Sequence, residues 1–174
     1  AGEKMLEEER RKFFYPVDPT ETSAQIGGTV ATNASGARTL FYGATREWVN
    51  GLTVVLSTGE VVRLKRGECR AVDGKIRISP RDGVDRIVEL PALELPETKH
   101  TAGYHLDARE GEDMDAVDLF VGNEGTLGVI TEVDLKLAVE PPERMYVTAF
   151  MPDENRALQF VDGMRGAGHD HLLA

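Results

Sequence analysis

The fold is decided by the stretch Gly122-Asn123-Glu124-Gly125-Thr126-Leu127-Gly128-Val129-Ile130-Thr131, in which three glycines run directly into an apolar segment. Apolar and polar residues alternate from there to Val139, which predicts a strand over 128–139 with one buried face. A Rossmann turn needs the opposite order, with a strand before its glycines and a helix after them. The stretch therefore argues against a Rossmann-type NAD enzyme, and it also fits a turn that sets strand register.

A second glycine-rich stretch lies upstream and reads Ile26-Gly27-Gly28-Thr29-Val30-Ala31-Thr32-Asn33-Ala34-Ser35-Gly36. Paired glycines allow a ligand to approach the backbone closely, and the polar residues of the stretch add hydrogen-bonding groups beside it. A phosphate or a polar ring edge could lie there. The same composition also fits a short helix of small residues packed on a sheet, so the residues alone leave both interpretations open.

The chain between the two stretches predicts a hairpin over 51–64, turning at Ser57-Thr58-Gly59-Glu60. Residues 66–96 are less apolar and interrupted by prolines, which indicates an excursion, with a small hairpin at Asp73-Gly74. A helical turn is expected over 113–120.

The two ends of the chain carry separate signals. Residues 5–14 have acidic residues before basic ones, which predicts a charged leader helix within 1–14. Pro141-Pro142 marks a boundary, after which we expect a strand over 145–151 and a helix over 153–165 with Asp153 as its N-cap.

Composition restricts the class of partner. The 174 residues are 41% hydrophobic and 29% charged, with 20 Lys and Arg against 30 Asp and Glu, so the net charge is −10. This surplus of carboxylates excludes a nucleic-acid-binding face, and any phosphate must be held mainly by backbone N–H groups. A single cysteine, Cys69, fits the cytoplasm, and no apolar run is long enough for membrane insertion.

Several motifs follow one another along the chain: Asp18-Pro19-Thr20-Glu21-Thr22-Ser23-Ala24-Gln25-Ile26-Gly27-Gly28, Ala31-Thr32-Asn33-Ala34-Ser35-Gly36, Tyr42-Gly43, Lys99-His100-Thr101-Ala102-Gly103-Tyr104-His105-Leu106, and 118–132. In this order they resemble the FAD-linked oxidases of the vanillyl-alcohol oxidase and p-cresol methylhydroxylase superfamily. The branch they resemble contains the glycolate oxidase flavin subunit and the D-lactate and D-2-hydroxyglutarate dehydrogenases. Asn123 stands where this branch more usually has Ser.

The resemblance implies an α+β fold, with an antiparallel sheet flanked by helices over 15–142. This would be the second subdomain of the FAD-binding domain, with 66–96 as its excursion. Residues 143–174 would then form the first strand and helix of a cap domain that holds the substrate. The family's first subdomain would precede this region, so we expect the chain to be an internal piece of a longer flavoenzyme that has little or no turnover alone.

The resemblance also implies which residues contact FAD. Main-chain amides near residues 27 and 125 are expected to converge on the same dinucleotide. The cofactor-binding set is Pro19, Thr22, Ser23, Ala24, Gln25, Gly27, Gly28, Thr32, Asn33, Ala34, Ser35, Gly36, Tyr42, Gly43, Glu124, Gly125, Thr126, Leu127, Gly128, Val129 and Ile130.

No catalytic residue and no metal ligand is assigned. His169 and His171 lack further ligands of the kind a metal site needs. His100 and His105 could face the flavin, although lone histidines are more often surface or core groups. Asp113, Asp115 and Asp118 are expected to form a solvated acidic rim.

The sequence thus predicts part of an FAD-dependent 2-hydroxyacid dehydrogenase or oxidase. Its expected partners are a small hydroxyacid, the remaining FAD subdomain, the cap domain and an electron-acceptor subunit. The alternative is a non-catalytic interaction module that no longer binds FAD.

Overall fold

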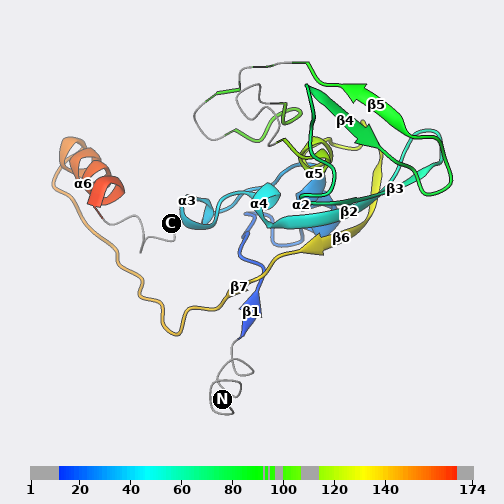
Figure 1. Ribbon diagram of the computed structural model, residues 1–174. Coiled ribbons are helices and arrows are strands. Elements are labelled where there is room, and N and C mark those ends of the chain that lie inside the picture. The colour runs from blue at the N-terminus through cyan, green and yellow to red at the C-terminus, as the bar shows by residue number, and fades with distance from the viewer. Residues whose placement is uncertain (1–11, 92, 94, 97–99, 107–113, 168–174) are drawn as a thin grey trace, which may run out of the picture.

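The computed structural model describes residues 12–91, 93, 95–96, 100–106 and 114–167. Its centre is an antiparallel sheet in the order β3-β2-β6 (Figure 1). The predicted hairpin is confirmed, since β2 pairs with β3 around a turn in which Gly59 has a φ of 84°. That positive φ favours glycine. The bounds of the sheet are Val49–Val55 for β2, Val61–Lys65 for β3 and Val129–Leu135 for β6.

Short helices surround this sheet, which confirms the α+β class. α5 is buried along its whole length and contacts β2 and β3, whereas α2 contacts β6. The predicted helical turn over 113–120 therefore exists in its C-terminal part. The helix bounds are Ile26–Ala31 for α2, Thr39–Tyr42 for α3, Thr45–Trp48 for α4 and Ala116–Phe120 for α5.

The excursion forms a second, two-stranded sheet of β4 (Lys75–Ile78) and β5 (Arg86–Glu89). Asp73 and Gly74 both have positive φ, so the turn predicted there is present at the entry to β4. Ile76 and Ile78 are buried in the core, whereas every residue of β5 is exposed. The excursion is therefore part of the folded core on one side only.

The start of the excursion is joined to the chain just before and within α5. The Ala71 amide donates to the Met114 carbonyl at 2.8 Å, and the Ala116 amide donates to the Cys69 carbonyl at 2.9 Å. Backbone hydrogen bonds at this point fix the route of the chain out of β3.

The acidic rim is a wrong prediction for Asp115 and Asp118, which are 2% and 6% exposed. Asp115 caps α5 by accepting from the Val117 amide at 2.9 Å, and its other oxygen accepts from the Gly67 amide at 2.7 Å. Asp118 accepts from both terminal nitrogens of Arg66, at 2.7 and 2.8 Å. These partners satisfy the buried carboxylates, and they lie too far away in the sequence for local spacing to reveal them. Asp113 lies outside the described residues.

The strand predicted over 128–139 is interrupted. β6 ends at Leu135, the Lys136 amide donates to the Trp48 carbonyl, and β7 (Ala138–Val139) pairs with β1 (Phe13–Phe14) instead. Leu137 and Val139 are 52% and 44% exposed, so the expected buried face does not extend past Leu135. The leader-helix prediction is wrong for residues 13 and 14, because they pair as a strand; residues 1–11 lie outside the described part.

Beyond β7 the chain is extended and leads to α6 (Glu154–Ala167), which lies apart from the central sheet in Figure 1. The Asp153 N-cap is confirmed, since its Oδ1 accepts from the Arg156 amide at 2.9 Å. The strand predicted over 145–151 is absent: Tyr146 and Phe150 are 88% and 92% exposed and have no strand partner among the described residues. A single extended segment cannot satisfy its own backbone groups as a strand does. None of the described helices has the length and apolar composition required to cross a membrane.

We expect Asp118→Asn to lower the free energy of unfolding by roughly 3 kcal/mol, because it leaves Arg66 beside a neutral group in a mostly buried site. The matched control is Glu89→Gln, which alters an exposed pair with Lys75 and should cost less than about 1 kcal/mol. Urea unfolding followed by circular dichroism measures both. Equal losses would show that the Asp118 pair contributes no more than a surface pair.

Candidate functional site

The two glycine-rich stretches lie side by side in the structure. We call residues 26–36 the first bend and residues 122–131 the second bend. The Gly122 amide donates to the Val30 carbonyl at 2.9 Å, and the Glu124 amide donates to the Ala31 carbonyl at 2.8 Å. These two bonds attach the turn after α5 to the last residues of α2. The two bends are therefore adjacent at residues 30–31 and 122–124, whereas the convergence of the amides near residues 27 and 125 on one dinucleotide stays a prediction.

The chain after α2 is held by hydrogen bonds to α4. Asn33 has a φ of 47° and is 6% exposed, and its Oδ1 accepts from the Arg46 amide at 2.9 Å. The Thr45 hydroxyl donates to the Ala34 carbonyl at 2.7 Å and accepts from the Tyr15 hydroxyl at 3.2 Å. Burial raises the pKa of Tyr15, so its hydroxyl stays protonated as this donor. The segment 33–36 is thus fixed from both sides.

Gly36 is the point at which the preceding loop touches this segment. A Cβ at Gly36 would lie 1.6 Å from the Asp18 carbonyl oxygen, a backbone atom that cannot move aside easily. The Gly36 amide donates to Thr39 Oγ1 at 2.8 Å, and that hydroxyl donates back to the Gly36 carbonyl at 2.6 Å. The loop that carries the first predicted contacts, Pro19 to Gln25, therefore starts against Gly36.

The second bend is held by Asn123, which is 2% exposed. Its side chain donates to the Phe120 carbonyl and accepts from the Leu127 amide at 3.4 Å. Gly128 then allows β6 to begin close to β2, because a Cβ there would lie 2.6 Å from Val54 Cγ1. Where the branch that the chain resembles more usually has Ser, Asn123 has a longer side chain, and its amide group supports the turn from the buried side.

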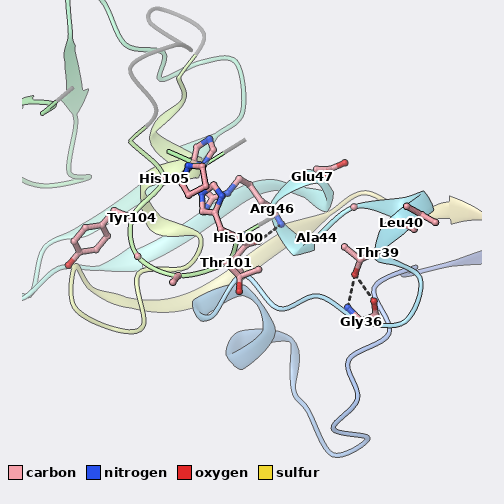
Figure 2. Close-up of a pocket in the computed structure, with 15 residues that line it drawn as sticks. Gly36, Thr39, Leu40, Ala44, Arg46, Glu47, His100, Thr101, Tyr104 and His105 are labelled. Atoms are coloured by element: carbon pink, nitrogen blue, oxygen red, sulfur yellow. Dashed lines mark hydrogen bonds between the residues drawn. The ribbon is translucent and has the colours of Figure 1, made fainter. Parts of the chain in front are cut away.

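A cavity of about 660 Å³ opens beside the first bend. This volume is typical of small-molecule sites. In Figure 2, Arg46, His100 and His105 lie together in the middle of the cavity wall, with Tyr104 on one side and Thr39 and Leu40 on the other. The cavity is lined from two parts of the chain, residues within 33–47 on one side and Pro96 with residues 100–105 on the other.

The predicted site residues fall into two groups. Asn33, Gly36 and Gly43 line the cavity. The lining does not include the others, namely Pro19, Thr22, Ser23, Ala24, Gln25, Gly27, Gly28, Thr32, Ala34, Ser35, Tyr42 and residues 124–130. Gly27 and Gly28 are exposed on α2. Tyr42 acts behind the wall, where its carbonyl accepts from Trp48 Nε1 at 2.7 Å and the two rings pack edge to face.

The predicted set does not include several cavity residues. Arg46, Thr39 and Glu47 line the cavity but are isolated polar residues in a mixed stretch, and no local pattern singles them out. His100 and His105, which flank Gly103-Tyr104, both line the cavity. His169 and His171 lie outside the described residues.

Residues 4–65 match the family described as FAD binding domain. The match therefore begins before Tyr15, the first residue of the resemblance described above. The chain is 35% identical over 147 residues to a D-lactate dehydrogenase of Anaerostipes hadrus, covering 84% of this chain and 22% of that protein.

Two further relatives have related names. The glycolate oxidase subunit GlcD of Bacillus subtilis is 32% identical over 91% of this chain and 26% of its own length. A D-2-hydroxyglutarate dehydrogenase of Xanthomonas citri is 32% identical over 88% of this chain and 24% of its own length. The chain spans about a quarter of the length of these curated relatives. On these matches, the chain belongs to the FAD-linked oxidases of the vanillyl-alcohol oxidase and p-cresol methylhydroxylase superfamily.

Proposed function

We propose that the protein carrying this chain is an FAD-dependent oxidoreductase that oxidises a 2-hydroxyacid, and that this chain forms part of its FAD site. The observation that carries the proposal is the pair of backbone hydrogen bonds that attaches the 122–124 bend to the end of α2. It brings together two stretches whose glycines leave main-chain groups accessible. Relatives named for lactate, glycolate and 2-hydroxyglutarate support the substrate class.

The residues present fit a dinucleotide. A Cβ added at Gly27 or Gly28 would have no heavy atom within 4 Å, so the space over the first turn of α2 is open. Gln25, at the N-cap, makes no side-chain hydrogen bond to the amides of that turn. Free helix N-terminal amides suit a phosphate, and in a chain with a net charge of −10 they offer donors without a lysine cluster.

FAD, when bound, would supply the two-electron acceptor that converts the hydroxyacid to the 2-oxoacid. The residues of this chain would bind and orient it. The proposed contacts are those expected from the sequence: Pro19 and Thr22 to Gln25 from the loop, Gly27, Gly28 and Thr32 to Gly36 from the first stretch, Tyr42 behind the cavity wall and Gly43 in it, and Glu124 to Ile130 from the second bend. No residue of the set is assigned to proton transfer.

The domain assignment belongs to the same proposal. We place residues 15–142 in the second FAD subdomain and 143–174 at the start of the substrate domain. The apolar side chains exposed along 145–150 support this, because a substrate domain would cover them. The remaining FAD subdomain and an electron-acceptor subunit are the proposed partners, and the single cysteine supports the cytoplasm as the compartment.

We expect the purified full-length protein to be yellow, because the bound flavin absorbs visible light. Adding D-lactate, glycolate or D-2-hydroxyglutarate without oxygen should bleach the flavin band with the substrate that the enzyme oxidises. Absorbance spectra before and after addition measure this. A protein that stays colourless after incubation with FAD would contradict the proposal and favour the interaction module.

We expect Gly28→Ala, and equally Gly27→Ala, to weaken FAD binding by roughly tenfold, because the new methyl group occupies the space left for the ligand. Stability should not fall, since alanine favours a helix over glycine by about 0.5–1 kcal/mol. FAD titration and thermal unfolding measure the two effects separately.

Gly163→Ala in α6 is the matched control, because a Cβ there also has no heavy atom within 4 Å. It should leave FAD affinity unchanged. Unaltered affinity in Gly27→Ala and Gly28→Ala alike would remove α2 from the proposed site.

A further inference from the structure

Arg46 joins three segments that are far apart in the sequence. Its amide donates to Asn33 Oδ1 at 2.9 Å, which ties α4 to the first bend. Its guanidinium donates to the carbonyls of Asp118 and Val121, the latter at 2.7 Å, which ties α4 to the end of α5. Carbonyls at a helix C-terminus lack partners within the helix, so an arginine is a suitable donor for them.

The second bend begins in contact with this arginine. Gly122 has a φ of 87°, and a Cβ there would lie 3.2 Å from Asn33 Cβ and 3.4 Å from an Arg46 terminal nitrogen. The first bend, the arginine and the second bend therefore pack against one another without spare room. A displacement of the Arg46 guanidinium would move both bends.

Arg66 fixes the other side of the same junction. It holds both oxygens of Asp118 and also donates to the carbonyls of Val49 and Arg46, at 3.0 and 3.2 Å. The Asp118 carboxylate lies farther from Arg46, with 3.6 Å between a guanidinium nitrogen and the nearest carboxylate oxygen. The carboxylate is thus bound primarily by Arg66, and the backbone carbonyls are the close partners of Arg46.

Arg46 also reaches the cavity. It lines the cavity while its side chain is only 14% exposed, and Figure 2 shows it beside His100 and His105 in the wall. A guanidinium stays protonated at all working pH values, and its interaction with an anion is stronger in such a partly buried position than in water.

We infer that Arg46 is a positioning and specificity-determining residue for the flavin: it holds the two glycine bends in register and places a permanent positive charge at the cavity wall. This inference rests on the proposed function. It implies that the site distinguishes flavins by their negative charge. A flavin with a diphosphate, FAD, gains from Arg46, whereas riboflavin, which has the same ring system and no phosphate, gains little.

The test compares Arg46→Met and Arg46→Lys in the full-length protein, with FAD and riboflavin as ligands in separate fluorescence titrations. Arg46→Met should weaken FAD binding by roughly tenfold or more and riboflavin binding by less than about threefold. Arg46→Lys keeps the charge but loses the two-pronged contact with the carbonyls. It should restore the ratio of the two affinities while the flavin circular dichroism band stays altered.

Arg63→Met is the matched control, because Arg63 is 69% exposed on the sheet and pairs only loosely with Glu132, at 3.5 Å. It should change neither affinity. Thermal unfolding of each variant identifies a loss of fold.

Equal weakening of FAD and riboflavin in Arg46→Met, or no weakening of either, would overturn the inference while leaving the proposed function intact. A wild-type protein that binds neither flavin would overturn the proposed function, and with it this inference.

Discussion

The site depends on two main-chain hydrogen bonds, from the amides of Gly122 and Glu124 to the carbonyls of Val30 and Ala31. They connect segments that are about ninety residues apart and set the distance between the two glycine-rich bends. Because they join backbone to backbone, they depend on the path of the chain more than on side chains. That path is itself restricted, since Asn33, Gly122 and Glu124 all adopt positive φ around the junction. Conformational restriction of these residues is thus part of how the site is held.

The same junction contains two partly buried arginines of this acidic chain. Arg46 and Arg66 lie among carbonyls and the buried Asp118 carboxylate, where each guanidinium can use several donors at once. A lysine has one compact charged group and could not bridge the same set. The two arginines therefore join α4, α5 and the start of the excursion. Arg46 also brings positive charge to the cavity wall in a protein with a surplus of carboxylates.

The sequence predicted correctly those features that depend only on residues close together in the chain. Gly59 identified the hairpin, and Asp153 identified the start of α6. The glycine stretches were identified as a paired site, although their contacts with FAD stay a prediction. Arg46 could not be found, since its role comes from carbonyls more than seventy residues away. The apolar alternation over 145–151 predicted a strand wrongly because such a pattern reports burial, and burial needs a covering element that the described residues do not include.

The attachment of the start of the excursion to the start of α5 has a consequence for how such a chain can vary during evolution. Residues 69–71 and 114–116 are bonded to each other, so these bonds position the start of α5 without using the exposed strand β5. Lengthening a loop whose ends are already fixed adds little entropic cost. Homologous proteins can therefore vary the exposed strand β5 more freely than β4, whose Ile76 and Ile78 pack in the core above this junction.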